Sequence, residues 1–135
     1  MAALSNYLEN ALINGTLRAT NYTAPATVYV GLYTTDPTDA NTGTEVSGNG
    51  YARKSATFAA PSNGAASTNA DIQFDQATGS WGTIAYFGIL DASTSGNLLY
   101  HGALTTSKTI DTGDVFKIAS GSLTVTFAKI VQLLY

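Results

Sequence analysis

The residues that most often carry out chemistry in proteins are few in this chain of 135 residues. His101 is the single histidine and there is no cysteine, which excludes a thiolate zinc site, a pair of histidine ligands, a cysteine nucleophile and any disulfide. His101 stands between Tyr100 and Gly102 in an expected strand, where a lone histidine is usually a structural or surface residue. We therefore predict no catalytic residue, no cofactor and no metal at His101.

The acidic residues form no recognisable site either. Asp36 with Asp39, and Asp111 with Asp114, are three residues apart in loop-like sequence, but neither pair fits a calcium loop with alternating ligands and a closing glutamate. We interpret them as turn and capping residues. Two acids from distant strands can meet in space, as in glycosidases, but no pattern points to such a pair. Phosphate-binding, dinucleotide-binding and serine-hydrolase motifs are also absent, so we predict that the protein is not an enzyme.

The composition favours a protein that packs against other proteins. The net charge is −3 and the six lysines and arginines are dispersed, so no basic stripe for nucleic acid is expected. Only 11% of the residues are charged, against about 25% in an ordinary soluble domain, so neighbouring molecules repel one another weakly. This favours a subunit of an array over an ordinary soluble protein. The chain has no stretch of about 20 apolar residues and no secretory signal pattern, so no membrane association is expected.

The elements that would position such contacts are one helix and several strands. Leu4, Leu8 and Leu12 recur every four residues, with Tyr7 and Ala11 beside them, which predicts an amphipathic helix over about residues 3–14, ended by Asn14-Gly15. Strands are expected at 28–33, 51–59, 70–74, 80–90, 97–105 and within 115–127. The fold class predicted is mainly β, an antiparallel β-sandwich or partly closed barrel with one short N-terminal α-helix, formed by a single domain over residues 1–135.

Two further segments are candidates for contacts. Residues 34–50 are rich in Thr, Gly, Asn and Asp and predict a long surface loop, which is either a contact loop or a mobile one. Residues 129–135 are almost wholly apolar. They form either an extra strand of the same sheet or an arm added to a neighbouring subunit, and we favour the arm.

Six stretches of the sequence carry a resemblance to known proteins: Ala3–Leu12, Tyr22–Tyr33, Thr44–Gly48, Gly50–Arg53, Ser80–Thr83 and Leu98–Leu104. In the same order along the chain, they resemble small virion structural proteins of tailed bacteriophages and prophages, a group often labelled phage tail fibre or capsid decoration (cement) protein. The resemblance covers the chain to about Phe127 and implies a protein made in the host cytoplasm and located in the virion, on the capsid surface or in the tail.

The resemblance implies two alternative roles. A cement protein would hold adjacent subunits of the major capsid protein, typically as a trimer. A tail-fibre or tail-tip subunit would take part in host attachment, and we expect it to show a shaft-like repeat or a receptor-binding face. The sequence has no internal repeat, so we favour the cement role. The interface candidates are Leu4, Tyr7, Leu8, Leu12, Asp36, Glu45, Ile130, Val131, Leu133, Leu134 and Tyr135.

A carbohydrate-binding module is the alternative from another class. Its sugar-stacking faces would come from the aromatic residues Tyr29, Tyr33, Tyr51, Trp81, Tyr86 and Tyr100. Core and interface roles for these rings are favoured, because aromatic side chains dominate the packing of small domains.

Overall fold

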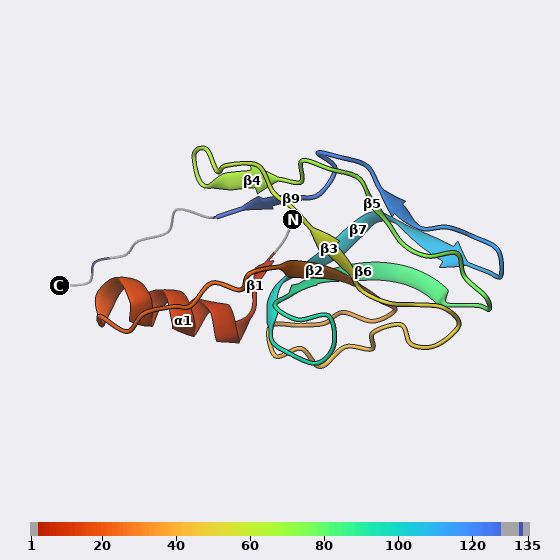
Figure 1. The fold of residues 1–135 in the computed structure, drawn as a ribbon. Coiled ribbons are helices and arrows are strands. Elements are labelled where there is room, and N and C mark those ends of the chain that lie inside the picture. The colour runs from red at the N-terminus through yellow and green to blue at the C-terminus, as the bar shows by residue number, and fades with distance from the viewer. Residues whose placement is uncertain (1–2, 128–132, 134–135) are drawn as a thin grey trace.

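The computed structural model describes residues 3–127 and 133. Figure 1 shows a helix that extends from one end of a β-rich body. The elements are β1 (Ala3–Leu4), α1 (Asn6–Leu17), β2 (Val28–Tyr33), β3 (Lys54–Ala56), β4 (Ala65–Ser67), β5 (Ile72–Gln73), β6 (Gly82–Leu90), β7 (Leu98–Ile110), β8 (Lys117–Ile118) and β9 (Thr124–Thr126).

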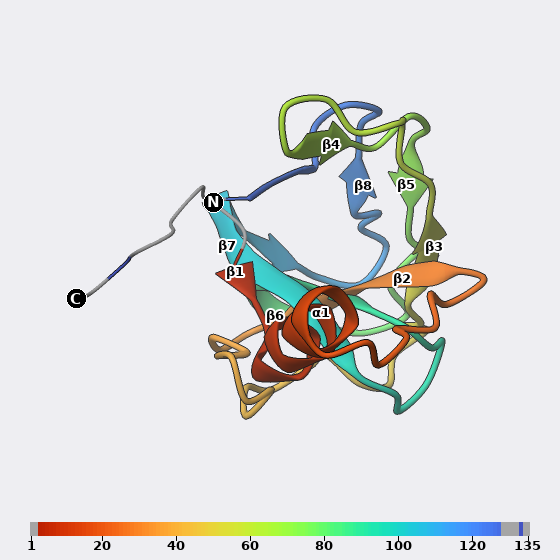
Figure 2. The ribbon, with the colours of Figure 1, turned by 90° about the vertical axis from the view of Figure 1, so that its left-hand side faces the viewer.

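The strands form two layers. Five of them make an antiparallel sheet in the order β1-β7-β6-β2-β3, and two antiparallel ribbons, β4-β9 and β5-β8, make the other layer. Figure 2 shows both ribbons on one side of the sheet, with β3 close to β5 at one edge. The predicted mainly β, sandwich-like fold with one short helix is confirmed, and the described strands do not close into a barrel.

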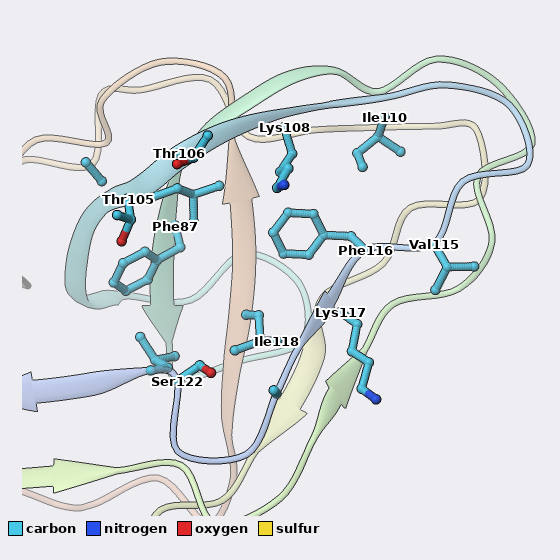
Figure 3. A pocket seen from close by; sticks show the side chains of 14 residues that line it. Phe87, Thr105, Thr106, Lys108, Ile110, Val115, Phe116, Lys117, Ile118 and Ser122 are labelled. Atoms are coloured by element: carbon cyan, nitrogen blue, oxygen red, sulfur yellow. The ribbon is translucent and has the colours of Figure 1, made fainter.

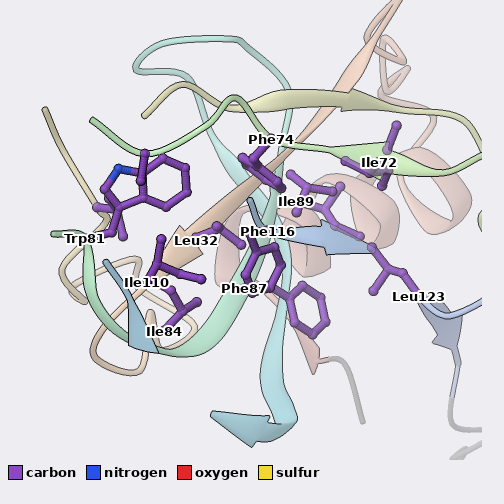
Figure 4. Packing of buried hydrophobic residues seen from close by; sticks show 14 of the residues in the cluster. Leu32, Ile72, Phe74, Trp81, Ile84, Phe87, Ile89, Ile110, Phe116 and Leu123 are labelled. Carbon is purple, nitrogen blue, oxygen red and sulfur yellow. The ribbon is translucent and has the colours of Figure 1, made fainter. Parts of the chain in front are cut away.

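The core lies between these layers, where apolar side chains of the sheet pack against those of the ribbons and of the segments joining them. Val30 and Leu32 of β2 and Ile84 of β6 are completely buried. An aromatic cluster closes one end of the core, where the Phe74 ring lies 5.7 Å from Phe116 in an edge-on arrangement (Figure 4). Burial of these side chains supplies the main favourable term in folding.

The helix begins and ends three residues later than the predicted span of 3–14. Residues 3–4 instead pair with Tyr100 and His101 as β1, which places Ser5 at the helix N-cap. Its Oγ accepts a hydrogen bond from the Leu8 N–H at 3.1 Å and donates one to the Leu98 carbonyl. Gly15 does not end the helix, because the chain remains helical to Leu17. The N–H groups of Arg18 and Thr20 then donate hydrogen bonds to the Asn14 carbonyl.

Only the first half of α1 is docked. Leu8 is buried against the sheet, whereas Ile13 and Leu17 are 52% and 78% exposed. The described part of the chain contains no helix that is long and apolar enough to span a membrane.

The structure predicts a large difference between neighbouring residues of β6. Ile84→Ala should lower the free energy of unfolding by about 2–5 kcal/mol, because the side chain is fully buried and the cavity cannot collapse completely. Thr83→Val, at the exposed neighbouring position, should change it by less than about 1 kcal/mol. Urea unfolding followed by circular dichroism measures both, and equal losses would show that Ile84 is not a core residue.

Candidate functional site

The most highly connected polar group of the protein is the guanidinium of Arg53. Its Nε and Nη2 atoms donate to the two carboxylate oxygens of Glu45, each at 2.8 Å. Its Nη1 atom donates to the carbonyls of Ala92 and Ser95 at 2.9 and 2.8 Å. The Arg53 side chain is 9% exposed and that of Glu45 is 23% exposed, so this is a largely desolvated, two-pronged ion pair. It joins the 34–50 loop to the β6–β7 turn.

Tyr51 extends this network into the sheet. Its hydroxyl donates to Glu45 Oε1 at 2.7 Å and accepts the Leu32 N–H of β2 at 3.0 Å. Burial, followed by the hydrogen bond to Glu45, raises the pKa of Tyr51. A Cβ atom at Gly31 would lie 2.9 Å from Glu45 Oε1, so the close approach of the carboxylate requires glycine there. The hydrogen bond to Glu45 also raises the pKa of Arg53.

The 34–50 loop is held by backbone pairing as well as by side chains. Glu45 forms an isolated bridge with Tyr33, and the Val46 N–H donates to the Leu32 carbonyl at 2.9 Å. The Tyr33 hydroxyl, on a side chain that is 2% exposed, donates to Asn41 Oδ1 at 3.2 Å. Burial, followed by the charge of Glu45, raises the pKa of Tyr33 to about 12. The loop therefore presents its exposed residues from a hydrogen-bonded frame.

The single histidine fixes the other end of this loop. His101 Nε2 lies 2.8 Å from Asp39 Oδ1, and Nδ1 lies 3.8 Å from Asp36 Oδ1. The Asn6 N–H, at the start of α1, donates to the Asp39 carbonyl at 2.9 Å. Because Ser5 Oγ donates to Leu98 rather than to His101, these described residues do not form a serine–histidine pair for nucleophilic catalysis. Asp39 instead connects the 34–50 loop to His101 of β7 and to Asn6 of α1, which is a structural role.

The described residues contain no group of three or more His, Asp or Glu side chains that could hold a metal ion. Their buried side-chain nitrogen and oxygen atoms all have hydrogen-bond partners.

An open groove separates the outer edge of β7 from β8 (Figure 3). We call it the β7–β8 groove; it has a volume of about 740 Å³. Its lining is Phe87, Ala103, Leu104, Thr105, Thr106, Lys108, Ile110, Val115, Phe116, Lys117, Ile118, Ala119, Ser122 and Leu123. The sequence alone did not indicate this groove, because it arises where the two layers fail to meet.

The predicted interface residues are found in different environments. Leu8 is buried, Leu4 and Leu12 are half-buried, and Tyr7 is 43% exposed. Asp36 is exposed. Glu45 is engaged by Arg53 and Tyr51 and is not a free surface carboxylate. Leu133 is 86% exposed, whereas Ile130, Val131, Leu134 and Tyr135 lie outside the described residues. The described members of this set, Leu4, Tyr7, Leu8, Leu12, Asp36, Glu45 and Leu133, therefore do not share one environment.

The aromatic side chains give little support to a sugar-stacking surface. Trp81 is 5% exposed and its Nε1 atom donates to the Asn49 carbonyl at 2.9 Å, while Tyr33 is 2% exposed. The Tyr51 ring packs edge-on against Trp81 at 5.5 Å. These three rings stabilise the fold and have no free face for a sugar.

Breaking the Glu45–Arg53 pair should destabilise the protein strongly. Arg53→Met should lower the free energy of unfolding by about 2–4 kcal/mol, because it leaves a half-buried carboxylate without its cation. Lys54→Met is the matched control, since the Asp75 partner is 63% exposed, and should cost less than about 1 kcal/mol. Urea unfolding measures both. The double variant Glu45→Gln with Arg53→Met should recover part of the loss, and strict additivity would contradict a direct coupling.

Tyr33 and Tyr51 should make the protein sensitive to alkali. Because their folded-state pKa values lie above the ordinary value of 10.0, the neutral phenols favour the folded state. This contribution is complete below pH 10 and is lost as the pH rises from there through 12, the approximate pKa of folded Tyr33. A titration of tyrosinate absorbance should show a late step that disappears in urea. A single step in the folded protein, identical to that in urea, would contradict this assignment.

Comparison with known proteins places these features in a family. The family model described as podophage GP4 fiber I protein gp80 matches residues 3–126, which includes α1 and every strand of the described structure. No curated protein is significantly similar to the chain. The match contains the Glu45–Arg53 network and the β7–β8 groove and stops before the apolar segment at 129–135. The chain belongs to the family of the podophage GP4 fiber I protein gp80.

Proposed function

We propose that the protein is a non-enzymatic structural subunit of a phage tail fibre, located in the virion and active through contacts with other virion proteins. The match to a podophage fibre family over residues 3–126 carries this proposal. It favours the tail-fibre alternative over the capsid cement role that we expected from the sequence. The absence of an internal repeat is a weak argument against a fibre, because a fibre can also be assembled from several copies of a small subunit.

The hydrogen bonds between its loops suit a rigid subunit that keeps its conformation when it binds a partner. Arg53 bonds two separate segments, the 34–50 loop through Glu45 and the β6–β7 turn through Ala92 and Ser95, and His101 of β7 joins the same loop to the sheet. A loop that is already ordered loses little conformational entropy when it binds a partner. The exposed residues of the 34–50 loop are therefore proposed as a preformed contact surface, and this surface is a candidate for host attachment.

The exposed end of α1 is a second proposed contact. Ile13 and Leu17 extend the apolar stripe beyond the point where Leu8 docks on the sheet. Apolar side chains exposed side by side on a projecting helix are typical of an interface with another subunit. We propose a homo-oligomer, with a trimer as the expected state, and other virion proteins as further partners.

Locating the protein on phage particles tests the proposal. Antibody labelling or an added density tag, observed by electron microscopy, should place the protein on the tail fibres. Particles from a phage in which the gene is deleted provide the control for unspecific labelling. Labels distributed over the capsid shell would instead support the cement role, and no label on any particle would contradict a virion protein.

A further inference from the structure

The β7–β8 groove exposes parts of the core that the sandwich covers elsewhere. Phe87, Phe116 and Leu123 lie at its base with 8%, 7% and 6% of their surfaces exposed. Val115, at its rim, is 45% exposed. The groove therefore has the chemistry of a hydrophobic slot, with an apolar base and the polar side chains of Thr105, Thr106 and Lys108 along one wall (Figure 3).

Both walls of the groove are free strand edges. β7 pairs with β6 along one side, but on its other side only Tyr100 and His101 pair, with β1. Beyond His101, up to Ile110, the outer edge of β7 has no strand partner among the described residues. β8 pairs with β5 on one side, and no described strand pairs with its other side. A strand inserted here would find unpaired backbone N–H and C=O groups beside an apolar base.

The same chain contains a segment of matching chemistry. Residues 129–135 read Lys-Ile-Val-Gln-Leu-Leu-Tyr, so in an extended conformation Val131, Leu133 and Tyr135 share one face, with Lys129 at its start. The seven residues would extend over about 23 Å, and the edge of β7 beside the groove covers residues 104–110, with an irregularity in the register between Ala103 and Lys108. The chain is fixed just before this segment, because the Phe127 N–H donates to the Gly64 carbonyl at 2.8 Å.

We propose that residues 129–135 of one copy insert as an added strand into the β7–β8 groove of a second copy, with Val131, Leu133 and Tyr135 toward the core. Leu133 is 86% exposed in the single chain, so it does not pack against its own sandwich. The contact is heterologous, because arm and groove are different surfaces, and copies joined in this way close into a ring or continue as a filament. The inference deepens the proposed homo-oligomeric fibre role and rests on it.

The lack of cysteine makes a directed cross-linking experiment possible. Two full-length variants, Leu133→Cys and Thr106→Cys, are purified separately, mixed and treated with a short thiol-specific cross-linker. The arm of one copy in the groove of the other should give a cross-linked heterodimer as the main product. Thr94→Cys mixed with Thr106→Cys is the control, since Thr94 is exposed in the β6–β7 turn but belongs neither to the arm nor to a proposed contact, and should give only background.

The outcomes separate insertion between copies from the alternatives. An arm labelled at Val131→Cys should also cross-link to Thr106→Cys of a second copy. Adding Leu133→Asp to the arm-labelled chain should abolish this cross-link, while its circular dichroism spectrum remains that of the folded domain. Cross-linking no higher than in the Thr94→Cys control would overturn the proposal. A chain with both Leu133→Cys and Thr106→Cys that cross-links only within itself would also overturn it. The experiment uses purified protein, so its failure is distinguishable from failure of the tail location, which is tested on particles.

Discussion

The buried guanidinium of Arg53 is the constraint on which the arrangement of the loops depends. Four of its hydrogen bonds connect one strand end to Glu45 in the 34–50 loop and to Ala92 and Ser95 in the β6–β7 turn. Withdrawing a charged side chain from water is costly, and the cost is offset only when the donors meet acceptors in good geometry. The network therefore favours one conformation of the three segments. The glycine at position 31 is part of the same constraint, since any side chain there would push against Glu45.

Much of the fold could be predicted from the sequence because its strands alternate clearly. The strand expected at 80–90 is observed as β6 at Gly82–Leu90, and the one at 28–33 as β2. β4 was not predicted, because Ala65, Ala66 and Ser67 show no contrast between two faces. β7 continues five residues beyond the predicted end at Thr105. The exposed stretch 106–109 has no apolar alternation to predict it, and the end of the strand is held by pairing of Lys108, Thr109 and Ile110 with β6.

The site was less predictable because its residues meet only in the folded chain. Glu45 was identified as an interface residue, yet its carboxylate is used by Arg53, eight residues away and across a loop. A signal was present in the composition: when only 11% of residues are charged, an acid and a base that flank an uncharged glycine-rich loop are candidates for pairing. The β7–β8 groove had no such signal. The groove results from the relative lengths of β7 and β8 and from the spacing of the two layers. The alternation of apolar and polar residues along a strand specifies neither of these.

The open edges of the sandwich explain where the few cations lie. Natural proteins protect free strand edges with lysine, because an unprotected edge pairs with any exposed strand. Two of the six basic residues, Lys108 and Lys117, line the β7–β8 groove. Lys117 also pairs with Asp71 at 3.1 Å, while Lys108 lies on the exposed part of β7. An edge that is apolar at its base and cationic at its walls disfavours random pairing but still admits a strand whose inward face is apolar. Such a distinction matters in a weakly charged protein, because electrostatic repulsion alone does not keep its strand edges from pairing in the wrong way.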